Sequence, residues 1–303
     1  MASSLPFLRV PTHLRPELAC EIFPDRVVAA RRPSGKTDPA LLRFCAAALP
    51  QAVLQPSIRA ANCADPEALA EALRSALSQT EGRTRNVTVI VPDLAARVFL
   101  LDFDSMPSRA REALPILRFR LRKMLPFEVD EAALSYQILQ HHPGPMRVLV
   151  VAMPGEIRAE YENAVQRAGF EPGAMMTSTL AALAALDTEE PALIVNRNSH
   201  SITTAITHKD QILLHRSLEL SQKPEREREE LAQSVTVATA YFEDLLAMPP
   251  RNIYYAGPGG ADEFSAWVNH ENPLAPKVRN LVSVSTQTPL YGLTAGVTGA
   301  LKN

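Results

Sequence analysis

The stretch VLVVAMPGEIRAEYENAVQRAGFEP, residues 148–172, decides the fold class. Its first five residues, 148–152, are all apolar, which predicts a short strand buried on both faces. Apolar side chains then recur at helical spacing, at Ile157, Tyr161, Val165 and Ala168. Gly169 follows them and is a typical helix stop. A buried strand followed by an amphipathic helix is the repeating unit of α/β proteins.

The segments upstream continue this alternation of strands and helices. Residues 18–23 and 26–31 flank Pro24-Asp25, which predicts a hairpin. Asp65-Pro66 predicts a helix start, because aspartate caps the first turn and proline fits its first position. The apolar run 87–91 predicts a second buried strand.

The segments downstream follow the same plan. They comprise a strand at 192–196, a hairpin at 201–216, a helix with apolar residues at helical spacing over 231–245, and a strand at 252–256. We therefore expect an α/β fold with a largely parallel sheet, which the hairpins near the start of the chain make mixed.

Composition narrows the possible functions. With 303 residues, the chain has room for about two domains. Its 31 basic and 33 acidic residues give a formal net charge of −2, so we expect no nucleic-acid partner. Three cysteines, no secretory signal and no long apolar run favour a reduced, cytoplasmic protein. Only twelve glycines argue against an enzyme that depends on glycine-rich phosphate loops.

The motifs that could carry chemistry are incomplete. Ser34-Gly35-Lys36-Thr37 matches the end of a P-loop, but Ala30 stands where that motif needs its first glycine. His141-His142 has no nearby cysteine or histidine at metal-ligand spacing, which favours a solvated loop over a metal site. No serine lies in a G-x-S-x-G elbow. We therefore predict no catalytic residue and no metal site.

Two further segments leave alternatives open. Residues 118–123 (RFRLRK) alternate basic and apolar side chains, which suits contact with phosphate or acidic lipid, but an ordinary solvated helix face is favoured. Gly257-Pro258-Gly259-Gly260 lies between a predicted strand and a predicted helix. Its backbone could approach a phosphate or a base there, and close packing of the strand on the helix explains the glycines equally well.

The order of these segments resembles the actin-like PilM family of type IV pilus assembly and, more distantly, the cytoplasmic part of the type II secretion GspL proteins. The most specific stretch is SMPSRAREALPILRFRLRKMLPFEVDEAALSYQIL, residues 105–139, with its helix, Leu-Pro-Phe stop and following strand. The stretch 148–172, the hairpin ending HRSLEL, the turn YYAGPGG and the closing YGLTAGVTGALKN fall in the family's order. The resemblance covers residue 85 to the end well and the first 84 residues only by pattern.

The resemblance implies an actin-like, ribonuclease-H-type fold of two lobes with mixed sheets. The first lobe would be residues 1–187, with an inserted subdomain at about 94–146. The second would be residues 188–303, with a reduced fourth subdomain, because the family's helical insertion after Leu220 is missing. We expect the corner Leu125-Pro126-Phe127, at the end of the helix in the inserted subdomain, to anchor that subdomain, with the Phe127 ring buried.

Intact members of the family hold ATP and Mg²⁺ between the lobes, with two Asp-x-Gly hairpins and a glycine-rich turn. Here the first hairpin, residues 20–31, lacks that pattern, and Asn196-Arg197-Asn198 stands where the family has Asp-Ile-Gly. We therefore expect no cofactor, with ATP binding lost. The vestigial candidates for the old site are Asn196, Asn198, Gly257, Gly259 and Gly260.

The function that the resemblance implies is a non-catalytic scaffold of an inner-membrane assembly platform. Its partner would be a PilN-like membrane protein, whose cytoplasmic N-terminal peptide docks beside the inserted subdomain, with Arg118, Phe119 and Arg122 as contact candidates. Contact with the membrane would then be made through partners only, and a homo-oligomer is possible. The alternatives are an actin-like ATPase or sugar-kinase-like phosphotransferase that retains nucleotide binding, and a stand-alone regulatory binding module.

Overall fold

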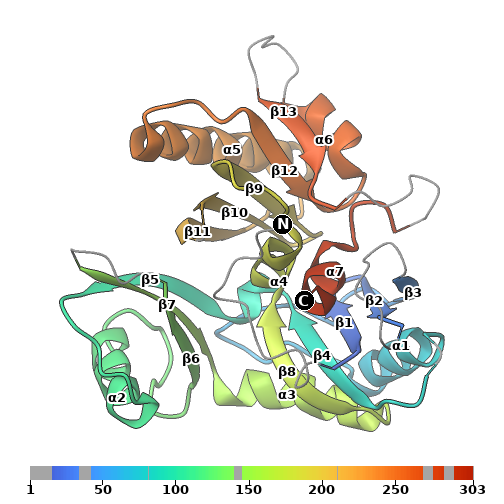
Figure 1. Ribbon diagram of the computed structural model, residues 1–303. Coiled ribbons are helices and arrows are strands. Elements are labelled where there is room, and N and C mark those ends of the chain that lie inside the picture. Colours follow the sequence, from blue (N-terminus) through green and yellow to red (C-terminus); the bar gives the residue numbers. More distant parts are fainter. Residues whose placement is uncertain are drawn as a thin grey trace.

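The computed structural model describes residues 16–33, 42–80, 82–139, 145–209, 211–268, 276–282 and 290–302. The P-loop-like segment 34–37 and the pair His141 and His142 lie outside these residues. The described chain forms two five-stranded sheets and one three-stranded sheet, with helices on their faces (Figure 1). The α/β class with mixed sheets that the sequence predicts is therefore confirmed.

The first sheet has the strand order β3-β2-β1-β4-β8. Its strands are β1 (Leu18–Ile22), β2 (Arg26–Arg31), β3 (Arg43–Ala48), β4 (Asn86–Val91) and β8 (Glu171–Thr177). Strands β1, β2 and β3 pair antiparallel, whereas β4 and β8 continue parallel to β1. Helices α1 (Pro66–Ser78) and α3 (Gly155–Arg167) cover one face and bury an apolar core against it.

The second sheet repeats this plan with the order β11-β10-β9-β12-β13. Its strands are β9 (Ala192–Arg197), β10 (Ser201–His208), β11 (Gln211–Glu219), β12 (Asn252–Ala256) and β13 (Lys277–Asn280). The first three again pair antiparallel, and the last two continue parallel to β9. Helices α5 (Pro224–Leu246) and α6 (Gly260–Val268) pack on its outer face. The two lobes are thus two copies of one topology.

Two helices lie between the two large sheets (Figure 1). They are α4 (Ser178–Ala185) and α7 (Ala295–Leu301), which pack on each other. Helix α7 also contacts β1, β2 and β4, so the end of the chain packs on the first sheet although the sequence division placed residues 188–303 in the second lobe. The boundary at residue 187 falls between α4 and β9.

The third sheet has the order β5-β7-β6, and all its pairs are antiparallel. Its strands are β5 (Arg97–Phe103), β6 (Ala133–Ile138) and β7 (Met146–Met153), with α2 (Ala110–Leu121) packed on one face. The strand at 148–152 was expected in a βα unit of a parallel sheet, and that expectation is wrong. It is the central strand of this antiparallel sheet, and its residues are apolar because both of its faces are covered.

The start of α1 and the end of α3 were predicted correctly from residues next to them in the sequence. The side chain of Asp65 accepts hydrogen bonds from the backbone N–H groups of Glu67 (3.1 Å) and Ala68 (3.0 Å), so it caps α1. Helix α3 ends at Arg167, and Gly169 has the positive φ (86°) of a helix stop. These are interactions between near neighbours, which is why the sequence reveals them.

The inserted subdomain differs from the sequence prediction at its corner. Helix α2 runs unbroken through Pro115, although a proline inside a helix normally kinks or breaks it. Leu125 packs against the core of the third sheet, but Phe127 is half-buried and does not belong to that core. Val129 occupies the buried position instead, so the anchor expected at Phe127 lies two residues further on.

Candidate functional site

A network of buried polar side chains lies where the two lobes meet. It is built by β1, the 3-10 turn Asp93–Ala95 (η4), the start of α4, and strands β9 and β10. Its members are Glu21, Asp93, Ser178, Thr179, Asn196 and Thr203, and each is buried. Buried polar groups are costly unless they are hydrogen-bonded, so their partners determine what this junction does.

Asp93 joins the first lobe to the second. Its Oδ1 atom accepts the backbone N–H of Thr179 at 3.0 Å, and its Oδ2 atom accepts the Thr179 hydroxyl at 2.6 Å. The Oγ1 hydroxyl of Thr203 in β10 donates to the same Oδ2 atom at 2.9 Å. One carboxylate therefore ties the start of α4 to the second sheet.

Asn196 makes the second bond between the lobes. Its Nδ2 atom donates to Oγ of Ser178 at 2.8 Å and to Oγ1 of Thr179 at 2.9 Å. An aspartate, the residue that the PilM-like pattern has here, carries no N–H group and could not make these two donations. The side-chain amide of Asn196 therefore forms hydrogen bonds within the protein that connect β9 to α4.

Glu21 is a member of this network that the sequence analysis missed. The Ser178 hydroxyl donates to its Oε1 atom, while Oε2 faces the backbone N–H groups of Gly296 and Val297 in α7 and has no well-formed hydrogen bond among the described residues. Burial raises the pKa of Glu21 to about 8. A charged residue type inside the otherwise apolar strand β1 was the available sequence signal.

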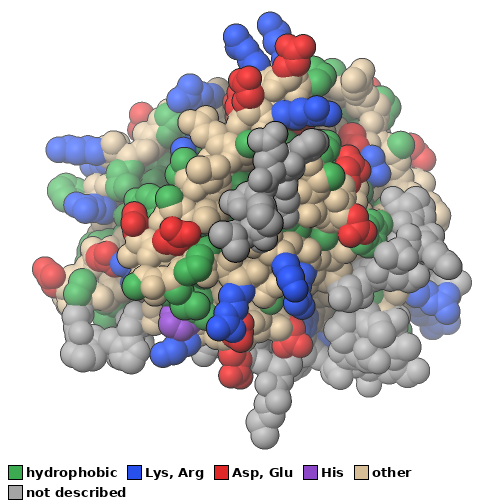
Figure 2. Space-filling view, turned by 90° about the horizontal axis from the view of Figure 1, so that it is seen from above, with side chains coloured by type: hydrophobic (Ala, Val, Ile, Leu, Met, Phe, Trp, Pro, Cys, Tyr) green, Lys and Arg blue, Asp and Glu red, His purple; other side chains and the backbone are tan. Residues whose placement is uncertain are grey.

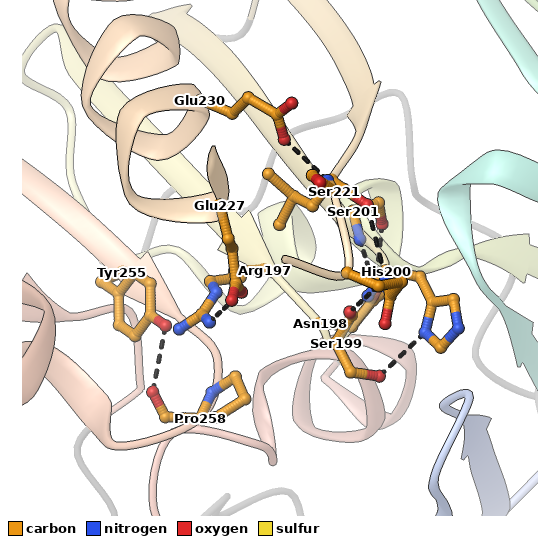
Figure 3. A network of polar contacts seen from close by, with 12 residues as sticks. Arg197, Asn198, Ser199, His200, Ser201, Ser221, Glu227, Glu230, Tyr255 and Pro258 are labelled. Carbon is orange, nitrogen blue, oxygen red and sulfur yellow. Dashed lines mark hydrogen bonds and ion pairs between the residues drawn. The ribbon is translucent and has the colours of Figure 1, made fainter. Parts of the chain in front are cut away.

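Asn198 closes the tip of the β9–β10 hairpin. Its Oδ1 atom accepts the backbone N–H groups of His200 and Ser201, each at 2.8 Å, and the Ser201 hydroxyl at 3.1 Å (Figure 3). This is the Asx-turn pattern, in which the side chain replaces a backbone acceptor. Asn198 therefore acts as a turn residue in this structure.

The glycine turn 257–260 is filled by the protein's own side chains. Gly259 and Gly260 have φ values of 74° and 65°, and a Cβ atom on Gly260 would lie 2.1 Å from the Tyr291 ring. The backbone N–H of Gly257 donates to the carbonyl of Gly292 at 2.7 Å. These contacts show that the glycines are closely packed by the segment around Tyr291.

Arg197 occupies the space between the hairpin and the outer helices, and the sequence analysis did not single it out. Its Nη2 atom lies 2.5 Å from the Glu227 carboxylate of α5, and its guanidinium lies 4.5 Å from the centre of the Trp267 ring of α6. Figure 3 shows the side chain between Glu227 and Tyr255, whose hydroxyl donates to the Pro258 carbonyl. An arginine stacked and paired in this way holds its neighbours in place.

A groove of about 510 Å³ lies between the third sheet and the first. Its walls include the consecutive residues 133–137 of β6 and 174–177 of β8. Successive side chains of a strand point to opposite faces, so a wall of consecutive residues indicates that each strand presents its edge. Both strands are indeed the last in their sheets. Apolar side chains dominate the lining, among them Leu134, Tyr136, Val151, Met153, Met175 and Leu180.

The three partner-contact candidates do not line this groove. The Arg118 guanidinium donates to the backbone carbonyls of Val129 and Ala132, so it holds the loop after α2. Arg122 forms an exposed ion pair of 3.1 Å with Asp130. Phe119 is 79% exposed on the outer side of α2. The structure therefore separates these residues from the groove between β6 and β8.

No arrangement of three or more His, Cys, Asp or Glu side chains suited to a metal ion occurs within the described ranges. The face of the molecule seen from the side of α5 and α6 carries interspersed basic and acidic side chains (Figure 2). Neither basic nor acidic side chains form a continuous patch on that face, in keeping with the net charge of −2. No helix of the described residues is long and apolar enough to cross a membrane.

This combination of duplicated sheets, shared central helices and an inserted sheet is the actin-like fold. The chain superposes on a solved protein from Bacteroides thetaiotaomicron described as having an actin-like ATPase fold, with a TM-score of 0.50, 8% identity and coverage of 96% of this chain and 98% of that one. The cytoplasmic domain of EpsL, an inner-membrane component of the type II secretion system of Vibrio cholerae, gives a TM-score of 0.54 at 11% identity, covering 94% of each chain.

The fold is closer still to that of a chain of the PilM–PilN type IV pilus biogenesis complex. The TM-score is 0.77 at 18% identity, over 95% of this chain and 100% of that chain. The actin-like, PilM-like fold that the sequence predicts is thus confirmed. No protein-family model and no curated protein matches the sequence.

Proposed function

We propose that this chain is a non-catalytic actin-like scaffold of a type IV pilus or type II secretion-like assembly platform at the inner membrane. The observation that carries the proposal is the groove between β6 and β8, which is open, mainly apolar and bordered by two strand edges. The fold shared with a chain of the PilM–PilN complex supports it. The protein would be cytoplasmic and would reach the membrane through its partners.

The proposed occupant of the groove is the N-terminal cytoplasmic segment of a PilN-like membrane protein. An extended peptide can pair its backbone with a free strand edge and place alternate side chains in apolar pockets. Arg158 and Gln137 are among the polar groups of a lining that is mainly apolar. We therefore propose that the docking site beside the inserted subdomain is formed by β6 and β8, in preference to the candidates Arg118, Phe119 and Arg122.

The proposal that the protein is non-catalytic rests on the contacts of the residues that we listed as remnants of a nucleotide site. Asn196 bridges the lobes, Asn198 closes a hairpin, and the Tyr291 ring packs against Gly260. The hydrogen bonds of Asn196 and Asn198 and the space beside Gly260 are taken up by other groups of the protein, which supports loss of Mg·ATP binding. The rival function is an ATPase or sugar-kinase-like phosphotransferase, and no observed contact favours it.

Peptide titration tests the proposal. A peptide copying the N-terminal cytoplasmic segment of a PilN-like protein from the same organism is titrated by fluorescence anisotropy against the wild type. Two exposed groove residues are then filled in the double variant Ser135→Trp/Ala174→Trp, while Phe119→Ser/Arg122→Glu alters the α2 candidates. We expect the groove variant to weaken binding at least about tenfold and the α2 variant to leave it unchanged. The reverse result, or no binding by wild type, would reject the site.

A further inference from the structure

The groove between β6 and β8 has two strand edges and a mainly apolar lining, and no segment of the described chain covers it. The two strands lie side by side in Figure 1, and each is the last strand of its sheet. Free strand edges beside apolar side chains pair readily with other chains, and proteins commonly cover them with a segment of their own. Such a segment would protect the groove while no partner protein is bound.

The first described residue of the chain, Pro16, belongs to the lining of this groove. A Cβ atom on Gly173 of β8 would lie 3.1 Å from Cγ of Pro16. Gly173 directly precedes residues 174–177, the wall that β8 contributes to the groove. Strand β1 begins two residues after Pro16, at Leu18, and β4 separates it from β8 in the sheet. The chain therefore passes the start of the groove wall before it enters the first sheet.

The residues that precede Pro16, MASSLPFLRVPTHLR, contain one apolar segment, LPFLRV, at positions 5–10. Its apolar side chains match the lining of the groove in character. Residues 7–10 all carry a backbone N–H group, which proline lacks, so they can pair with a free strand edge. Pro6 and Pro11 stand on either side of these four residues and would end the pairing. The segment thus offers a stretch as long as the wall at 174–177.

The connection between this segment and the groove is short. Residues 11–15 link the segment to Pro16, and five residues reach at most about 18 Å. The wall at 174–177 is itself about 13 Å long, at ~3.3 Å for each residue. A ligand on such a short connection has an effective concentration on the order of millimolar, so a weak contact is enough to populate the bound state.

We propose that residues 5–10 of the chain bind in its own groove between β6 and β8. Leu5, Phe7 and Leu8 would supply the apolar contacts, and the backbone of residues 7–10 would pair with a strand edge. The consequence rests on the proposed function, because the bound segment would compete with the partner's peptide for the same groove. If the groove is open for about a quarter of the time, the apparent affinity for that peptide falls about fourfold.

Hydrogen–deuterium exchange without any partner peptide tests the binding of the segment. The variant Leu5→Ser/Phe7→Ser/Leu8→Ser removes the apolar side chains, and Ser3→Ala/Ser4→Ala is its control. All these residues precede the described fold, so the circular dichroism spectrum should not change. We expect amides of β6 and of residues 174–177 to exchange about fourfold faster in the serine variant than in wild type and control. Equal rates in the three proteins would overturn the proposal, and so would protection that appears only at high protein concentration, because a second copy would then supply the segment.

Titration of the partner's peptide separates this inference from the proposed function. The serine variant should bind the peptide about fourfold more tightly than wild type and control. Faster exchange in the serine variant with equal peptide affinities would overturn the competition, since the two ligands would then occupy different sites. Equal exchange rates with equal affinities would overturn the binding of the segment and leave the proposed function standing. Faster exchange in the serine variant, with no peptide binding by any of the three proteins, would support the segment in the groove and reject the proposed function.

Discussion

The Oγ1 hydroxyl of Thr203 donates a hydrogen bond of 2.9 Å to Oδ2 of Asp93, a residue 110 positions earlier in the chain. The same carboxylate holds the first residues of α4 through Thr179. The two lobes are therefore joined by the protein's own buried side chains, and Asn196, a candidate remnant of a nucleotide site, belongs to the same network.

This relationship predicts a large loss of stability in Asp93→Ala. The substitution leaves the Thr179 amide and the Thr179 hydroxyl without their acceptor, whereas the Thr203 hydroxyl can still donate to Ser217 Oγ at 2.9 Å. Unsatisfied buried donors cost about 1–3 kcal/mol each. We expect the free energy of unfolding in urea to fall by roughly 2–4 kcal/mol. Asp102→Ala, which removes only a part-exposed ion pair with Arg147, should change it by about 1 kcal/mol or less. Equal losses in the two variants would contradict the role of Asp93.

Glu21 should make stability depend on pH. Its pKa rises from 4.5 to about 8 on folding, so the folded state binds the proton more tightly than the unfolded state. Stability is therefore lost as the pH rises from about 4.5 to about 8, at up to ~1.4 kcal/mol for each pH unit. In Glu21→Gln this loss should be absent, so that the variant melts at a higher temperature than wild type at pH 9.

Thermal melts of both proteins at pH 6 and pH 9 measure this effect. Glu71→Gln, an exposed position on α1, is the control and should follow the wild-type pH dependence. A Glu21→Gln melting curve that shifts with pH as much as the wild-type curve would show that Glu21 is ionised in the folded protein.

A side chain at Gly292, which packs against the glycine turn 257–260, should be strongly destabilising. This residue has a φ of 81°, and a Cβ atom there would lie 2.0 Å from the Gly257 carbonyl oxygen. Gly169 has nearly the same φ, 86°, but its nearest neighbour would be 3.9 Å away. Gly169→Ala therefore reports the backbone strain alone, about 1–2 kcal/mol. We expect Gly292→Ala to cost roughly 2 kcal/mol more in urea unfolding, and equal costs would show that the turn has room to open.

Mg·ATP should not bind at physiological concentrations. The positions that would face it are engaged: Asn196 with Ser178 and Thr179, and Gly260 with the Tyr291 ring. Isothermal calorimetry with millimolar Mg·ATP should give only the heat of dilution. Restoring the pattern with Asn196→Asp/Asn198→Gly should not create binding, because the surrounding side chains still fill the site. Saturable binding by wild type would favour the ATPase or phosphotransferase function instead.

Much of the fold was predictable because its signals are local. The turn at Pro24-Asp25, the cap at Asp65 and the helix stop at Gly169 each involve residues within a few positions of one another. The run 148–152 showed only that a strand is covered on both faces, and could not show that it belongs to an antiparallel sheet. Pairing partners depend on contacts across the chain, which apolar pattern alone does not encode.

The site was predictable only in part, because its contacts join residues that lie far apart in the sequence. Asn196 and Asn198 stood out as replacements within a motif, but the partners that give them their roles did not. Glu21 meets Ser178 across 157 positions, and Asp93 meets Thr179 across 86. The groove was not predictable from the sequence either, because β6 and β8 form its walls only when the third sheet packs beside the first.

Hydrogen–deuterium exchange of the complex with the PilN-like N-terminal peptide tests the central claim most directly. A peptide that adds to the strand edges should slow amide exchange in β6 (Ala133–Ile138) and β8 (Glu171–Thr177) and leave the turn 257–260 unchanged. The Ser135→Trp/Ala174→Trp variant, under the same conditions, should show no such protection. Protection confined to the hairpin at 196–201 and the glycine turn, with β6 and β8 unaffected, would contradict the scaffold mechanism.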